Sequence, residues 1–200
     1  HDFDNVDTTV LEVIKDNIVS VLKTVGHQKT IESIVRKDLF SGLYSEEYLY
    51  GEGRKIIDQY TTSTICMYKI INLEEINNKY CRELGNKVIE RTSEYIKQNI
   101  STQYVYVRYM GPKFVIAFSG VELNGVAEFI NELKEKLENT IISLNENNDE
   151  EEKSKKMEVC PKLNFTLSTY YKGTGLEEVL KKQEEYLDNC DANESNITNI

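Results

Sequence analysis

The chain has 200 residues, enough for one domain with an attachment; 40% are hydrophobic, 29% are charged, and the formal net charge is −10. This composition excludes wholesale disorder and a collagen-like repeat, and the acidity disfavours binding to the phosphate backbone of nucleic acids. No run of about 18 apolar residues occurs and no basic-then-apolar leader opens the sequence, so we expect no membrane contact within it.

The first 36 residues predict a helical segment that precedes the main domain. Apolar residues recur at three and four positions from Val10 to Val25, and Asp7 with the two threonines after it can cap the start. Gly26 interrupts the pattern, and a second helical stretch follows through Val35. The helix either packs on its own domain or pairs with its twin in a dimer. We expect 1–36 to be a signalling or linker helix and 37–200 to be a separate domain.

From residue 45 the pattern alternates between helix and strand. In chain order we expect helices over 46–60, 72–80, 84–100, 121–144 and 176–190, and strands over 63–71, 104–109, 114–118, 163–171 and 197–200. Gly111 and Pro112 form a turn signal, so the strands around them should form a hairpin. The polar stretch 145–156 is typical of a mobile loop. The sequence therefore predicts an α/β fold with a mixed central sheet flanked by helices.

The cysteines and histidines give no sign of a metal site. The chain holds four cysteines and two histidines, and no cysteine pair has the CxxC spacing of a zinc cluster. Cys66 lies in an apolar run and should be a buried thiol, which fits a reducing compartment. We expect no metal, no other cofactor and a cytoplasmic location.

Four segments resemble motifs of the GGDEF domain family, in the family's order and at similar distances. Residues 38–49 (DLFSGLYSEEYL) resemble D-x-L-T-G-L-x-N-R-R-x-L, and 76–86 (INNKYCRELGN) resemble I-N-D-x-Y-G-H-x-x-G-D. Residues 108–116 (RYMGPKFVI) resemble R-Y-G-G-D-E-F-V-I, and 165–168 (FTLS) resemble V-T-x-S. The resemblance covers 38–200 and implies the fold of GGDEF domains and nucleotidyl cyclases.

GGDEF domains are usually diguanylate cyclases. Two subunits each hold one GTP, and Mg²⁺ bound by carboxylates assists the attack that gives cyclic di-GMP. By the resemblance, the first metal-binding aspartate falls on Lys69 and the second acid of that motif on Ile71. A charged lysine has no lone pair, so it cannot be a ligand of a cation.

The signature motif has changed as well. Its first glycine is Met110, its aspartate is Pro112 and its metal-binding glutamate is Lys113, while Gly111 and Phe114 are retained. Met110 adds a side chain where the backbone must approach the nucleotide, and Pro112 removes an N–H group from the turn. The R-x-x-D motif of product inhibition falls on 101–104 (STQY), without either charge. We therefore expect neither cyclase activity nor the family's inhibitory binding of cyclic di-GMP.

The charge reversal extends to a third position, because the phosphate-contacting lysine of the family falls on Glu74. One interpretation is that Glu74 forms salt bridges with Lys69 or Lys113 and fills an emptied pocket. The other is that the two lysines replace Mg²⁺ and hold a phosphate without metal.

Two further residues are candidates for nucleotide binding. Asn77 stands where the family reads guanine, although an asparagine in a helix is also a common surface or capping residue. Arg108 could approach a phosphate, or it could be an ordinary solvated strand residue.

We expect a catalytically inactive GGDEF-like regulatory domain of a bacterial signalling protein, acting as a receptor, dimerisation or protein-interaction module. The alternatives are a module that binds GTP or a related nucleotide without metal, and an enzyme with residual cyclase activity. The sequence opens in a polar stretch without an initiator Met, and family domains often follow sensors. We therefore expect a fragment of a longer protein, cytoplasmic or the cytosolic part of a membrane-anchored one. A protein partner or self-association is expected, and nucleic acid is not.

Overall fold

The computed structural model describes residues 15, 17–21, 23, 37–145, 156–190 and 195–200. It divides into two units, His1–Lys37 and Asp38–Ile200. In the first unit, residues 17–21 are helical, and the rest of the helix expected before residue 36 lies outside the described residues. None of the helices in the described part of the chain is both long and apolar enough to span a membrane.

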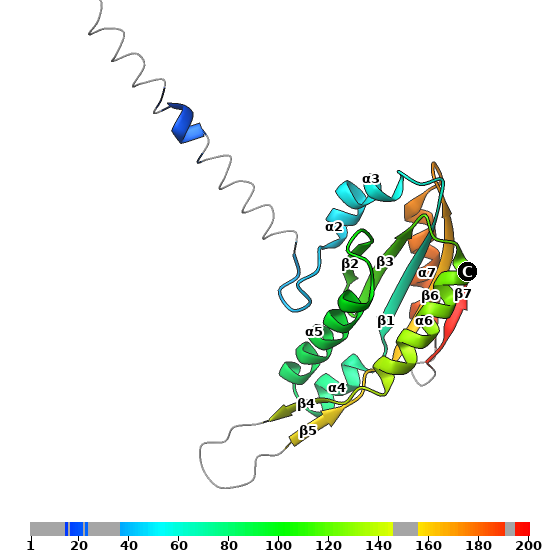
Figure 1. Cartoon of the computed structure of the whole chain (residues 1–200). Coiled ribbons are helices and arrows are strands. Elements are labelled where there is room, and N and C mark those ends of the chain that lie inside the picture. Colours follow the sequence, from blue (N-terminus) through cyan, green and yellow to red (C-terminus); the bar gives the residue numbers. More distant parts are fainter. Residues whose placement is uncertain (1–14, 16, 22, 24–36, 146–155, 191–194) are drawn as a thin grey trace, which may run out of the picture. The chain divides into compact units, whose positions relative to one another are not determined.

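The described part of the second unit is built on one mixed sheet (Figure 1). Its strand order is β2-β3-β1-β6-β7, where β1 is Thr62–Ile70, β2 is Val105–Met110, β3 is Lys113–Ser119, β6 is Leu163–Tyr171 and β7 is Ile197–Asn199. The pairs β1–β3, β1–β6 and β2–β3 are antiparallel, and β7 runs parallel to β6. The predicted mixed sheet, its hairpin and its short last strand are confirmed.

Helices cover both faces of this sheet. The described helices are α2 (Glu46–Tyr48), the π-helical turn η1 (Leu49–Gly53), α3 (Arg54–Ile57), α4 (Leu73–Lys79), α5 (Arg82–Asn99), α6 (Leu123–Glu138) and α7 (Leu176–Asn189). Apolar residues of α4, α5 and α6 join one buried cluster, whereas those of η1, α3 and α7 join another. Strand β1 supplies both clusters, because successive side chains of a strand point to opposite faces: Tyr68 enters the first and Met67 the second.

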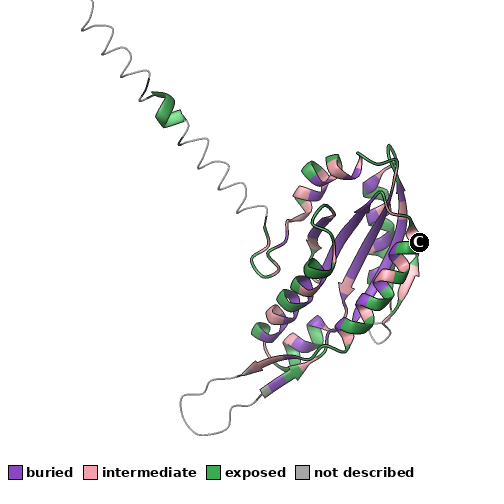
Figure 2. Ribbon diagram, viewed as in Figure 1, coloured by how far each residue is buried: buried purple, intermediate pink, exposed green. Residues whose placement is uncertain are grey.

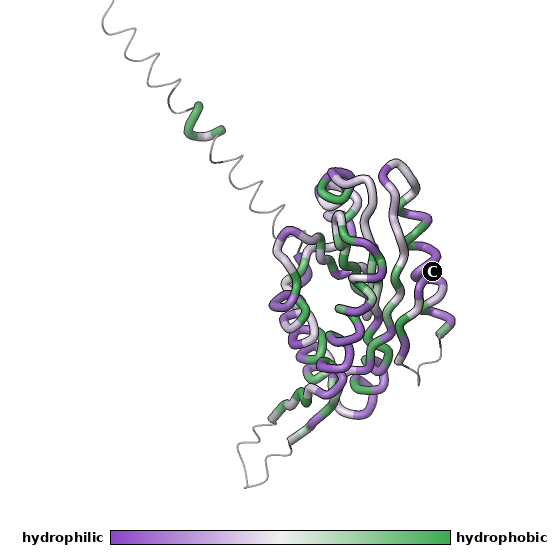
Figure 3. Tube along the Cα trace, turned by 45° about the vertical axis from the view of Figure 1, so that its right-hand side comes forward, coloured by the Kyte–Doolittle hydropathy of each residue, from purple (hydrophilic) through white to green (hydrophobic). Residues whose placement is uncertain are grey.

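Burial on two faces explains the apolar strands seen in the sequence. Figure 2 shows the central strands almost wholly buried, and Figure 3 shows hydrophobic positions recurring along the helices that cover them. All seven residues of β3 are buried, from Lys113 to Ser119. A strand covered on both faces reads as a continuous apolar run rather than an alternating one.

The helix expected over 121–144 is shorter than predicted. It ends at Glu138, and Ile142–Asn145 form β4, which pairs antiparallel with β5 (Lys156–Val159). Side chains end the helix: the Asn139 amide donates to the carbonyl of Glu135 at 2.8 Å, and the Thr140 hydroxyl donates to that of Lys136 at 2.8 Å. The predicted loop therefore begins later, and its remaining residues, 146–155, lie outside the described part.

Candidate functional site

The two lysines on which the resemblance places metal-binding acids lie side by side. Lys69, near the end of β1, is the direct cross-strand partner of Lys113, the first residue of β3. Like charges opposite one another in a sheet destabilise it, unless other groups compensate them. The compensation comes from α7, which packs against β1 and β6.

Two acids one turn apart on α7 hold both ammonium groups. Lys113 Nζ lies 2.7 Å from Glu184 Oε1 and 2.6 Å from Asp188 Oδ2. Lys69 Nζ lies 3.0 Å from Asp188 Oδ1 and also donates to the carbonyl of Leu187 at 3.3 Å. We call these four residues (Lys69, Lys113, Glu184 and Asp188) the lysine cluster. The side chain of Lys113 is only 8% exposed, so its ammonium depends on these partners.

The pKa values of the lysine cluster follow from these contacts. Burial lowers the pKa of Lys113, but its hydrogen bonds to Asp188 and Glu184 outweigh burial and raise the pKa above the usual value. Burial raises the pKa of Asp188, but hydrogen bonds from Lys113 and Lys69 outweigh it and leave the pKa below the usual value. Lys113 and Asp188 are therefore held in their charged forms.

The salt bridges expected from Glu74 are not present. Glu74 is exposed in the first turn of α4, and no ion pair joins it to Lys69 or Lys113. That interpretation rested on charge sign alone. The acids that neutralise the lysines come from α7 instead, because this helix crosses the sheet beside both strands.

The signature turn connects β2 to β3 through Gly111 and Pro112. Gly111 has φ +56°, and the ring of proline fixes a negative φ, the combination found in a two-residue hairpin turn with glycine first. The carbonyl of Pro112 accepts a hydrogen bond from the N–H of Ile70 at 3.0 Å, which ties the turn to β1. Met110 is 56% exposed at its edge.

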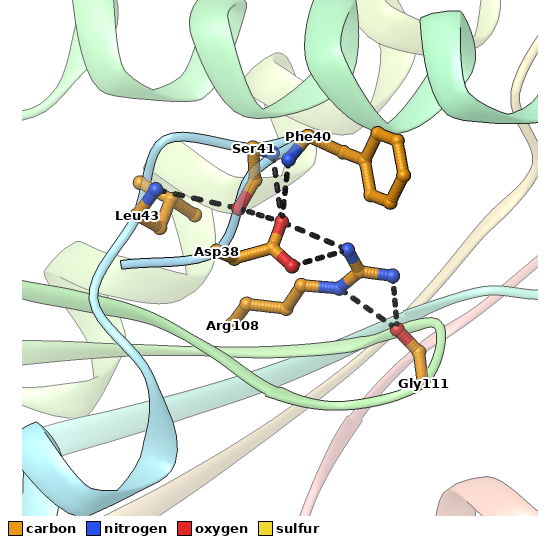
Figure 4. Close-up of polar contacts among 6 residues, drawn as sticks. All are labelled: Asp38, Phe40, Ser41, Leu43, Arg108 and Gly111. Carbon is orange, nitrogen blue, oxygen red and sulfur yellow. Dashed lines mark hydrogen bonds and ion pairs between the residues drawn. The ribbon is translucent and has the colours of Figure 1, made fainter. Parts of the chain in front are cut away.

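Arg108 joins this turn to the first motif (Figure 4). Its Nη1 donates to both carboxylate oxygens of Asp38 at 2.8 Å, and its Nε and Nη2 donate to the carbonyl of Gly111 at 3.1 and 3.0 Å. Asp38 also accepts from the backbone N–H and the hydroxyl of Ser41, both at 2.8 Å. Arg108 is therefore a structural clamp, neither solvated nor free to meet a phosphate. Burial raises the pKa of Asp38, and its bonds to Ser41 and Arg108 bring it below the usual value.

Replacing Arg108 with methionine is expected to reduce the free energy of unfolding by about 2 kcal/mol, since the half-buried Asp38 carboxylate loses its charged partner. Urea unfolding measures the change. Arg91→Met is the control, because Arg91 forms only an exposed ion pair within its own helix. Equal stability of the two variants would show that the clamp contributes nothing.

Acidification is also expected to destabilise the fold. A carboxyl with a depressed pKa in the folded state, as in Asp38 and Asp188, contributes stability above its unfolded pKa of about 4 and loses it as the pH falls through the folded value. Lys113, with a raised pKa, contributes below its unfolded pKa of about 10.4 and loses this as the pH rises through the folded value. Urea unfolding should give a plateau between about pH 5 and pH 9. In the control variant Asp38→Asn, Asp188→Asn, the free energy of unfolding should fall less steeply at acid pH. A constant free energy of unfolding of the natural chain down to about pH 3 would contradict the prediction.

Several predicted site residues line one cavity of about 700 Å³. They are Lys69, Ile71, Glu74, Asn77, Arg108, Gly111 and Pro112. Met110 and Lys113 are not part of its lining, since the first is exposed beside the turn and the second is buried under α7.

Asn77, a predicted nucleotide-binding residue, lies in this lining with an unpaired acceptor. Its Oδ1 is buried and has no hydrogen-bond partner among the described residues. It lies against Gly85, where an added Cβ would be only 1.9 Å from Oδ1, so any larger residue there would force the Asn77 side chain to move. A buried acceptor without a donor is costly, and none of the described residues offsets this cost.

The residues at this site do not fit a divalent cation. Mg²⁺ requires oxygen ligands. Lys69 and Lys113, the two residues nearest the turn, carry ammonium groups, and the side chain of Ile71 has no oxygen atom. No group of three or more His, Cys, Asp or Glu in the described part of the chain is arranged to hold a metal ion.

Comparisons with known proteins agree with this fold. A family model, diguanylate cyclase GGDEF domain, matches residues 35–196, and the chain therefore belongs to the GGDEF domain family. A curated relative, uncharacterized protein y4lL of Sinorhizobium fredii, is 24% identical over 106 residues, which is 52% of this chain. The chain spans only 13% of that relative's length.

Solved structures show the same fold. The coiled coil and GGDEF domain of DgcB from Caulobacter crescentus, in complex with c-di-GMP, has a TM-score of 0.77 at 14% identity and covers 96% of this chain and 100% of its own. The FimX GGDEF domain from Pseudomonas aeruginosa has a TM-score of 0.68 at 11% identity, covering 82% of this chain and 99% of its own. Diguanylate cyclase SiaD from the same species, in complex with its activator SiaC, has a TM-score of 0.65 at 9% identity, covering 98% and 74%.

Sequence reasoning missed the two residues that organise the site. Glu184 and Asp188 lie in a helix with many exposed charges, and nothing in their spacing distinguishes them from a solvated face. The available signal was indirect: two lysines on neighbouring strands, one of them buried, require acids nearby, and the helix expected over 176–190 carries acids one turn apart.

Proposed function

We propose that this GGDEF domain is a catalytically inactive regulatory module of a cyclic di-GMP signalling protein. The observation that carries the proposal is the lysine cluster. Lys69 and Lys113 occupy the positions of metal-binding acids, and both are neutralised within the chain by Glu184 and Asp188. Phosphoryl transfer from GTP requires positive charge directed at the triphosphate, whereas here that charge is directed at α7.

The lysine cluster makes the former metal site a structural contact. The ammonium of Lys113 bridges two carboxylates and fixes α7 against the ends of β1 and β3. A bound metal cation would join carboxylates in a similar way in an active domain. A rigid joint at this position favours recognition or scaffolding over turnover.

The expected binding partner is a protein or a second copy of the chain. SiaD, whose fold this domain shares, was solved in complex with its activator SiaC. That relationship supports a protein-interaction role for a GGDEF domain and leaves the identity of the partner to experiment.

The test is incubation of the chain with GTP and either Mg²⁺ or Mn²⁺, followed by chromatographic analysis of the products. We expect no cyclic di-GMP, with SiaD as the positive control under the same conditions. Restoring acids in a Lys69→Asp, Lys113→Glu variant should not create activity, because Ile71, Met110 and Pro112 remain. Cyclic di-GMP formed by the natural sequence above the blank would refute the proposal.

A second candidate function is nucleotide sensing, favoured by the 700 Å³ cavity that Asn77 and Lys69 line. Calorimetry with GTP, with and without Mg²⁺, tests it. Sensing predicts saturable binding that needs no metal and weakens in Asn77→Ala and Lys69→Ala. No heat of binding at millimolar GTP would exclude this candidate and leave the regulatory proposal untouched.

A further inference from the structure

A second cavity lies at the opposite end of β3 from the lysine cluster. Strand β3 begins at Lys113, a member of that cluster, whereas Phe118, near the end of the strand, lines the cavity. The cavity has a volume of about 280 Å³ and lies where the end of α5, the segment before β2 and the first turns of α6 meet. The lining residues used in the argument below are Ile100, Tyr104, Phe118, Val121, Gly125 and Phe129.

The lining of this cavity carries no charge. Among the described residues that line it, none is an aspartate, glutamate, lysine, arginine or histidine. Ser101 and Tyr104, where the resemblance places the two charged residues of the product-inhibition motif, both belong to the lining. An ion that entered would lose hydration without meeting an opposite charge. The cavity is therefore suited to an uncharged molecule.

Aromatic and aliphatic side chains form a wall that a bound molecule can reach. Four of them are half-buried and keep accessible surface: Ile100, Tyr104, Val121 and Phe129. Phe118, 3% exposed, lies behind them, and its ring centroid is 5.1 Å from that of Tyr104 and 6.1 Å from that of Phe129. Aromatic rings prefer such separations, so a flat ring beside Tyr104 and Phe129 would extend an existing row of rings.

The size of the cavity favours a small molecule over a protein partner. A stable protein interface engages about 20–30 residues on each side, whereas nine residues line this cavity. None of the large hydrophobic side chains that are exposed in the described part of the chain belongs to the lining. An apolar cavity of about 150 Å³ is enough to hold benzene, so 280 Å³ accommodates one or two fused rings.

Gly125 leaves this space open. It is the third residue of α6, and a Cβ added to it would meet no heavy atom within 4 Å. Glycine is a poor helix former, so a larger residue would favour the helix. A long side chain at this position would instead occupy the cavity, which makes Gly125 the natural position for a test.

We propose that this cavity binds an uncharged aromatic molecule of one or two fused rings. The ring system packs against the half-buried surfaces of Tyr104 and Phe129, and the open space at Gly125 admits it. The site is independent of the lysine cluster and of the proposed function.

Two-dimensional NMR and calorimetry on the full chain test the proposal, with indole as the uncharged aromatic probe. We expect saturable binding, with the largest amide shifts in the segments 99–104 and 118–129. Indole-3-acetate, which adds a carboxylate to the same rings, should bind at least about fivefold more weakly, because the lining offers no cation.

Gly125→Leu should weaken the binding of indole at least about tenfold, because its side chain fills the cavity, while the melting temperature stays equal or rises. Gly125→Ala is the matched control. It also improves helix propensity but adds only one methyl group, so the affinity for indole should change by less than about twofold. Phe129→Leu keeps an apolar side chain and removes the ring, and it should weaken binding at least about threefold.

Four results would overturn the proposal. They are the absence of saturable binding up to millimolar indole, equal or tighter binding of indole-3-acetate, unchanged affinity in Gly125→Leu, and amide shifts that concentrate on the residues of the 700 Å³ cavity. Sedimentation adds a fifth. A natural chain that self-associates and a Gly125→Leu variant that does not would mean that a second copy, and not a small molecule, fills the cavity.

Discussion

Replacing Lys113 with methionine is expected to lower the free energy of unfolding by about 3–4 kcal/mol. The substitution keeps a long apolar stem but removes the ammonium that lies between Glu184 and Asp188. These two carboxylates, one turn apart on α7, would then repel each other beside the sheet without a compensating charge. Urea unfolding followed by circular dichroism measures the loss.

Two control variants make this prediction specific. Lys69→Met should cost less than about 1 kcal/mol, because Lys69 is more exposed and its one ionic partner, Asp188, is 48% exposed. The triple variant Lys113→Met, Glu184→Gln, Asp188→Asn should recover part of the stability, since it removes the repulsion between the two carboxylates and leaves only the partly exposed Lys69 without an ionic partner. A Lys113→Met protein as stable as the natural chain would mean that the lysine cluster does not fasten α7.

Replacing Phe114 with alanine is expected to reduce the free energy of unfolding by about 3–5 kcal/mol. Phe114 is fully buried, and its ring stacks on that of Tyr68 with centroids 4.8 Å apart. The guanidinium carbon of Arg108 lies 5.8 Å from the same ring, so the substitution also loosens the clamp above it. Thermal and urea unfolding measure the effect.

Phe40→Ala is the matched control, because Phe40 is 48% exposed and should lose less than about 0.5 kcal/mol. This contrast would assign Phe114, the phenylalanine of the signature-like turn, to packing of the core. Similar losses in both variants would contradict this packing role.

Local sequence patterns predicted most of the helices and strands. They failed where contacts between residues far apart in the sequence determine the structure. The strands β1, β3 and β6 were recognisable because burial on both faces demands continuous apolar runs. The end of α6 was not, since apolar residues continue in helical spacing through Ile141 and Leu144. Strand β4 exists because it pairs with β5, and no local signal reveals that pairing.

The site shows the same division. The resemblance led us to consider Lys69 and Lys113 together, and the structure has them opposite one another on neighbouring strands. Their partner Asp188 lies 119 residues from Lys69 and 75 from Lys113, so only the tertiary fold brings them together. The interpretation of the sequence considered Arg108 without its partner Asp38, which begins the first motif. The opposite charges of these two residues, in two separate motifs, were the signal for the clamp.

The most direct test of the central claim is a crystal structure of the chain grown with Mn²⁺ and a non-hydrolysable GTP analogue, with anomalous scattering used to locate manganese. We predict that Lys69 and Lys113 stay paired to Glu184 and Asp188 and that no side chain at this site coordinates a metal ion. Anomalous density for manganese bridging the triphosphate and side chains of this chain would contradict the account.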